Sequence, residues 1–213
     1  MKRLNKVTAA VLASTISAAA FIVPSVASAE LSANIGVSNM YLWRGTNLSL
    51  DGGVVSGGLD YSHESGAYAG MWTTSETDGH ETDLYVGFGG EVGAVSYDIS
   101  YWAYLYPEDD KIADGDISEV IVSLGTGPVT ATAYISADEG SSEEYNYYTL
   151  SAEMGAFSAT YGIWDDSSYS HVTGSYAATD ELAFSISVAM EDEGTVEEDP
   201  LFAVSYTKSF EIK

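Results

Sequence analysis

The chain has 213 residues, with 32 acidic and seven basic side chains, and its formal net charge is −25. This acidity argues strongly against nucleic acid as a partner, because phosphate binding needs a basic face. The sequence contains no cysteine, which excludes disulfides, thiolate metal sites and a cysteine nucleophile.

The first 29 residues have the three-part composition of a secretory signal peptide. Residues 1–6 are basic, residues 7–23 are small or apolar, and residues 27–29 read Ala-Ser-Ala, as at a signal-peptidase site. The alternative is an uncleaved anchor helix, but the apolar run is short and rich in Ser and Thr for that role. We therefore expect a signal peptide over 1–29 and one mature domain over 30–213.

The mature chain keeps four basic residues against all 32 acids, a net charge of −28. It has no run of 18 apolar residues, so the sequence predicts no transmembrane helix. An exported chain of this kind is either soluble or a membrane β-barrel, in which apolar and polar residues alternate along each strand instead of forming a long apolar run.

About twelve segments of the mature chain alternate between apolar and polar residues, which is the period of a β-strand. The first apolar face comprises Leu31, Ala33, Ile35, Val37, Tyr41 and Trp43, a middle one Leu84, Val86 and Phe88, and the last one Phe202, Val204, Tyr206 and Phe210. The opposite faces carry Ser, Thr, Gly, Asn, Tyr and acids with almost no Lys or Arg, and no helical segment intervenes. A soluble sandwich can alternate in the same way.

Aromatic residues gather at the ends of the segments, which suits the interfacial girdles of a membrane barrel. These residues are Tyr41, Trp43, Trp72, Trp102, Tyr104, Tyr106, Tyr145, Tyr147, Tyr148, Trp164, Tyr169 and Phe210. The sequence thus predicts that these rings lie where the barrel leaves the hydrocarbon.

The connections between segments alternate in kind. Short turns are expected at 63–66, 89–93, 125–128, 153–155 and 178–181, and longer, mostly acidic loops at 44–52, 75–80, 107–116, 137–144, 165–168 and 191–200. Short turns on one rim and longer loops on the other are typical of outer-membrane barrels. We expect an all-β fold, a transmembrane antiparallel up-and-down β-barrel of about twelve strands, with ten or fourteen as alternatives.

The opening of the mature chain carries distinctive motifs. Residues 32–34 read Ser-Ala-Asn, residues 41–45 read Tyr-Leu-Trp-Arg-Gly, and residues 57–61 and 68–70 read Gly-Gly-Leu-Asp-Tyr and Tyr-Ala-Gly. With these motifs the sequence resembles the TorF family of porins (the Gcw_chp family). The resemblance is most distinctive over residues 31–75, and it implies an outer-membrane barrel and a porin without naming a substrate. Many outer-membrane barrels end on an aromatic residue, whereas Phe210 is followed here by three more residues.

Parity places Arg44 on a polar face near the outer end of the first strand. Acids on polar faces are Asp60, Glu81, Asp83, Asp98, Glu119 and Glu153. Because a buried charge needs a partner, we expect Arg44 to lie in the lumen, pair with one or more of these acids and form a constriction. The alternative is that such a pair merely fills a narrow, plugged barrel.

The expected function is passive diffusion of small hydrophilic solutes across the bacterial outer membrane. Because the lumen is acidic, we expect it to prefer cations. The alternative is a closed barrel with a structural, adhesion or loop-presenting role, and a third reading is a soluble exported sandwich. Expected partners are outer-membrane lipid, lipopolysaccharide and, at the acidic loops, weakly bound divalent cations; no cofactor is expected. We expect no enzyme, although an Asp–His–Ser cluster around His171 and residues 165–168 is conceivable.

Overall fold

The computed structural model describes residues 29–50, 52–76, 79–106, 117–137, 146–166, 168–192 and 200–212, with the backbone alone at residues 191–192. The expected signal peptide, apart from Ala29, lies outside the described residues. So do most of the acidic loops expected at 107–116, 137–144 and 191–200.

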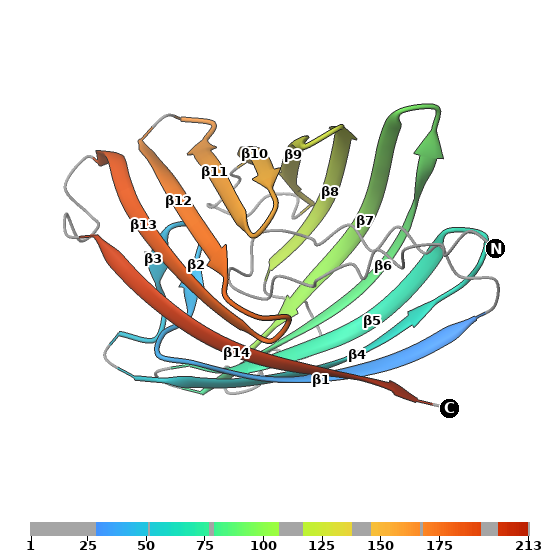
Figure 1. The fold of residues 1–213 in the computed structure, drawn as a ribbon, viewed down its shortest axis with the longest axis horizontal. Helices are drawn as coiled ribbons and strands as arrows, with labels where there is room; N and C mark the ends of the chain where they lie inside the picture. Colours follow the sequence, from blue (N-terminus) through green and yellow to red (C-terminus); the bar gives the residue numbers. More distant parts are fainter. Residues whose placement is uncertain are drawn as a thin grey trace, which may run out of the picture.

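In the described part of the chain, twelve antiparallel strands form a closed barrel (Figure 1). They are β1 (Glu30–Ser38), β4 (Val54–Ser62), β5 (Ala67–Ser75), β6 (His80–Val92), β7 (Val95–Leu105), β8 (Ile117–Thr126), β9 (Val129–Ser136), β10 (Asn146–Met154), β11 (Phe157–Trp164), β12 (Tyr169–Ala177), β13 (Leu182–Asp192) and β14 (Leu201–Ile212). Two short strands, β2 (Leu42–Trp43) and β3 (Thr46–Asn47), pair with each other apart from the barrel. The predicted fold class and strand number are confirmed. Within the described ranges, no helix is long and apolar enough to cross a membrane.

The barrel closes because β1 pairs on both of its edges. Leu31 lies opposite Tyr61 of β4 and Ile212 of β14, and antiparallel pairing continues along both neighbours. Closure leaves no exposed sheet edge, so the strands satisfy one another's backbone N–H and C=O groups. It also brings the start of β1 and the end of β14 to the same end of the barrel.

The connections at that end, which we call the turn rim, are tight. Two-residue turns at 93–94, 127–128 and 155–156 join consecutive strands, and each begins with a glycine at positive φ. Glycine adopts this conformation without steric cost, which is why such turns select it. The opposite end, the loop rim, carries the connections β1–β4, β5–β6, β7–β8, β9–β10, β11–β12 and β13–β14.

Apolar side chains face outward along the strands, and polar side chains face the interior. On β6, Val86 and Phe88 are 56% and 43% exposed, whereas Glu81 and Asp83 are 2% and 0% exposed. Further exposed apolar residues are Ile35, Val37, Leu59, Met71, Ile99, Leu124, Leu150, Tyr161, Ile186, Phe202 and Val204. The buried set is rich in Ser, Thr and carboxylates, the reverse of a water-soluble barrel.

The prediction that these aromatic residues form a girdle on the outside of the barrel is wrong for several of them. Tyr41, Tyr104, Tyr147 and Tyr169 are 8% exposed or less, because they point into the barrel. The first barrel strand ends at Ser38, so Tyr41 is not on its outer face as the alternation predicted. Tyr148 and Phe210 do lie outside, at 40% and 49% exposure. The interior of a twelve-strand barrel is wide, and these rings help to fill it.

Two tyrosines interlock with two glycines across β5 and β6. Gly70 lies opposite Tyr85, and Tyr68 lies opposite Gly87. A Cβ atom at Gly70 would lie 2.4 Å from the ring of Tyr85, and one at Gly87 would lie 2.2 Å from the ring of Tyr68. Each ring therefore occupies space that the opposite residue leaves free only because it is glycine.

We expect Gly70→Ala to destabilise the barrel by about 1–3 kcal/mol, because the added methyl group overlaps the Tyr85 ring. The control is Gly174→Ala on β12, where the nearest atom to a new Cβ, Ile186 Cγ2, is 3.8 Å away. The temperature at which the folded band is lost in heat-modifiable gel migration measures both. Equal stability of the two variants would contradict the interlock.

Candidate functional site

The connection between β1 and β4 folds into the barrel. Its strands β2 and β3 form a small hairpin over residues 41–49, here called the lumen hairpin, which lies inside the barrel with Gly45 against His171 of β12 (Figure 1). The Leu48 N–H donates to the Tyr41 carbonyl at 2.9 Å, and the Tyr41 N–H donates to Ser49 Oγ at 2.9 Å. These bonds close the hairpin on itself at the loop-rim end of the lumen.

Arg44 and Gly45 form the tip of this hairpin, both with positive φ, at 46° and 84°. A two-residue turn of this hand requires positive φ at both central positions. Glycine meets that requirement freely, but arginine does not, so surrounding contacts must hold Arg44 there. Gly45 is confined as well, because a Cβ on it would lie 2.4 Å from His171 Cγ.

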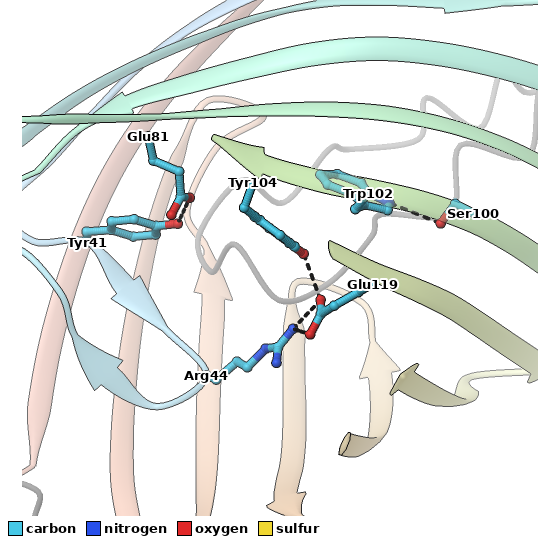
Figure 2. Close-up of polar contacts among 7 residues, drawn as sticks. All are labelled: Tyr41, Arg44, Glu81, Ser100, Trp102, Tyr104 and Glu119. Carbon is cyan, nitrogen blue, oxygen red and sulfur yellow. Dashed lines mark hydrogen bonds and ion pairs between the residues drawn. The ribbon is translucent and has the colours of Figure 1, made fainter. Parts of the chain in front are cut away.

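The guanidinium of Arg44 pairs with Glu119 on β8 (Figure 2). Arg44 Nη2 donates to Glu119 Oε1 at 2.7 Å and to Oε2 at 2.6 Å, and the two side chains are 2% and 0% exposed. Burial alone would lower the pKa of Arg44, but the charge and hydrogen bonds of Glu119, together with Tyr104 and Tyr134, raise the pKa above its ordinary value. The hairpin tip therefore carries a permanent positive charge inside the barrel.

Four aromatic rings surround the same guanidinium. Its central carbon lies 4.4 to 5.2 Å from the ring centroids of Trp43, Tyr134, Tyr147 and Trp164, a group we call the aromatic cage. The negative faces of aromatic rings attract a cation most strongly where water is excluded. The cage and Glu119 together explain how a charge is held in an otherwise buried position.

Phenol groups hold the carboxylates of this region. Tyr41 of the lumen hairpin donates to Glu81 Oε1 at 2.5 Å, and Tyr106 donates to the other oxygen of Glu81. Tyr104 donates to Glu119 Oε2 at 2.8 Å (Figure 2). Two bonds thus anchor the hairpin to the wall: Tyr41 binds Glu81 of β6, and Arg44 binds Glu119 of β8.

The six predicted acids fall into three groups. Glu81, Asp83 and Glu119 lie near the loop rim with the lumen hairpin, and Glu119 is the partner of Arg44. Asp60 and Asp98 line the half of the lumen nearer the turn rim. Glu153 lies at the turn-rim end of β10, where it is exposed.

The acids of the turn-rim half also accept hydrogen bonds from tyrosines. Tyr68 donates to Asp98, with oxygen–oxygen distances of 2.8 and 2.9 Å. Tyr85 donates to Asp60, and Asn34 Nδ2 lies 3.4 Å from the other Asp60 oxygen. These are the tyrosines that interlock with glycines, so the packing across β5 and β6 positions the donors.

The expected position of Arg44 is corrected by the structure. Alternation placed it on a continuation of the first strand, but it lies at the tip of a separate hairpin. Alternation reveals neither the hairpin nor the cage residues Tyr134, Tyr147 and Trp164 as partners of this arginine. The signal available was Gly45, a turn residue between two short segments treated as strand and loop.

His171 takes part in packing the lumen hairpin. Its Nε2 lies 2.6 Å from the Tyr147 hydroxyl and its Nδ1 lies 3.0 Å from Thr173 Oγ1. Both ring nitrogens are engaged by these residues, and the conceivable cluster with the acids at 165–166 is not formed. Among the described residues, no group of three His, Cys, Asp or Glu side chains could hold a metal ion.

We expect Arg44→Met to lower the free energy of unfolding by about 3–5 kcal/mol, because it leaves Glu119 buried without its cation. Lys208→Met is the control: Lys208 pairs with Glu181 at 2.7 Å, but these side chains are 46% and 31% exposed, so little change is expected. Urea unfolding in detergent micelles measures both. A small loss for Arg44→Met, matching the control, would contradict a structural role for the buried pair.

No curated protein sequence matches the chain. The family model described as bacterial protein of unknown function (Gcw_chp) matches residues 24–199, which include β1 to β13 and every acid of the candidate site. The protein therefore belongs to the Gcw_chp family.

Proposed function

We propose that the protein is a bacterial outer-membrane porin, through which small hydrophilic solutes diffuse passively with a preference for cations. The single observation that carries this proposal is the sidedness of the barrel: apolar side chains cover its outside, and carboxylates lie within. In this proposal the barrel is a passive channel rather than an enzyme, and it is surrounded by lipid and lipopolysaccharide.

The outer face supports a lipid environment. Residues such as Ile35, Val86 and Phe202 are 53%, 56% and 62% exposed, and many others like them lie on the outside of the same wall. So much exposed apolar surface is unfavourable in water and favourable in hydrocarbon. A bilayer also requires that backbone polar groups pair within the protein, and closure of the strands into a barrel provides that pairing.

The lumen supports a preference for cations. Asp60, Glu81, Asp83, Asp98 and Glu119 are directed inward from β4, β6, β7 and β8. Among the described basic side chains, Arg44 faces these acids, whereas Lys208 is exposed and pairs with Glu181. An excess of carboxylates along a low-dielectric passage lowers the energy of a cation in it and raises that of an anion.

A second candidate function has an observation of its own. The lumen hairpin and the aromatic cage occupy the loop-rim end of the interior, with Tyr41, Arg44 and Tyr147 each 2% exposed or less. This filling favours a closed barrel with a structural, adhesion or loop-presenting role. Conductance of the purified protein distinguishes the two functions.

We expect the reconstituted protein to conduct in a planar bilayer and to show a cation-selective reversal potential across a KCl gradient. Asp60→Asn and Asp98→Asn should each shift that potential toward zero, because each removes a negative charge from the passage. Glu64→Gln, in the exposed β4–β5 turn, is the control and should leave the potential nearly unchanged. Anion selectivity would overturn the cation preference, and absence of conductance would favour the closed barrel.

Leu150→Arg should destabilise the barrel in lipid by about 2–4 kcal/mol, because Leu150 lies on the outer face in the middle of β10 and would place a charge in hydrocarbon. Met154→Arg is the matched control on the same face at the end of the same strand, where the cost falls to about 0–1 kcal/mol. Unfolding by guanidinium chloride in lipid vesicles measures both. Equal, negligible effects would indicate that the outer face meets water.

A further inference from the structure

Asp83 on β6 is a buried carboxylate to which no described residue donates a hydrogen bond. Its side chain is 0% exposed, and within the described ranges neither of its oxygens has a hydrogen-bond partner. Removing a charged carboxylate from water is costly unless a donor, a cation or a proton replaces that water. The position therefore calls for a group that no described residue supplies.

The donors near Asp83 are engaged elsewhere. Tyr41 donates to Glu81, two residues away on the same face of β6. Arg44 and Tyr104 donate to Glu119 (Figure 2). Arg44 pairs with Glu119, tyrosines donate to Glu81, and the described residues give Asp83 neither a cation nor a hydrogen-bond donor.

The surroundings of Asp83 are aromatic. In the strand register, Trp72 of β5 and Tyr104 of β7 are its direct neighbours on either side. The next cross-strand pair, Tyr85 and Trp102, is stacked with ring centroids 4.2 Å apart and planes 17° from parallel. Aromatic faces beside a carboxylate are the surroundings in which organic cations are bound.

This chemistry distinguishes between kinds of cation. A divalent metal ion prefers six or more oxygen ligands, and the described residues offer no cluster of three suitable side chains. An ammonium or guanidinium group needs fewer oxygens, since its remaining faces can lie against rings.

The protein already binds a cation of this kind in the same lumen. The guanidinium of Arg44 is held by one carboxylate, Glu119, and by the four rings of the aromatic cage. At Asp83 a carboxylate again has aromatic residues as its cross-strand neighbours, Trp72 and Tyr104.

We propose that Asp83 anchors the ammonium or guanidinium group of a small organic cation that enters the lumen, with Trp72 and Tyr104 beside it. This inference rests on the proposed channel and names its substrate class. The site would hold the cation transiently beside the lumen hairpin.

The test is binding to the full-length folded barrel in detergent, followed by tryptophan fluorescence and by the unfolding temperature. Methylguanidinium and methylammonium are titrated against KCl and CaCl₂ at equal ionic strength. We expect saturable binding of the two organic cations and at least about tenfold weaker binding to Asp83→Asn. Asp180→Asn, an exposed aspartate in the β12–β13 turn, is the matched control and should bind as the unaltered protein does.

Two further measurements keep the proposal testable if either Asp83→Asn or Trp72→Leu folds poorly. Asp83→Asn should itself unfold at a higher temperature without ligand, because it removes an uncompensated buried charge. Trp72→Leu should weaken methylguanidinium binding while it leaves the carboxylate in place. Equal binding to Asp83→Asn and the unaltered protein, or equal responses to KCl and methylguanidinium, would overturn the site.

The outcomes for the site and for the channel can be separated. A barrel that binds methylguanidinium at Asp83 but passes no current would overturn the channel and leave a binding site inside a closed barrel. A barrel that conducts while methylguanidinium neither binds nor alters the unfolding temperature would overturn the site alone, with a proton as the group that neutralises Asp83.

Discussion

The pairing of β1 with β14 is the constraint on which the rest of the structure depends. It joins Leu31 to Ile212 and converts a row of antiparallel strands into a continuous wall. Without it, the two outer strands would present unpaired backbone groups, and the apolar and polar faces would both meet the same solvent. With it, the alternation of the sequence becomes a difference between an outside and an inside, and carboxylates can be held apart from bulk water.

An enclosed interior of this width must be filled or left to water, and the chain fills part of it. The lumen hairpin brings Arg44 to Glu119, while tyrosine hydroxyls donate to Glu81, Asp98 and Asp60. Large rings reach inward where the facing strand offers glycine, as Tyr68 and Tyr85 do. The polar face of the alternation is therefore a network of acids and phenols, in which Asp83 has no hydrogen-bond partner among the residues that the structure describes.

The sequence predicted the fold well because alternation and turn residues act locally. Two-residue periodicity in segments such as 84–88, and glycines at 93, 127 and 155, specify strands and turns with little help from distant residues. The site was predicted less completely. Parity could place Glu81 and Asp83 inside, but Tyr147 and Trp164 surround Arg44 only because a loop folds inward. That choice depends on contacts between residues far apart in the chain, which periodicity does not record.

Strand β1 contributes both to closing the barrel and to placing the lumen hairpin. It forms the seam with β14, whose partners lie at opposite ends of the sequence and so carry the largest loop-closure cost in the barrel. It also leads directly into the lumen hairpin, whose Arg44 is buried only once a wall surrounds it. Burial of the Arg44–Glu119 ion pair therefore depends on the same closure that pairs the backbone of β1 with that of β14.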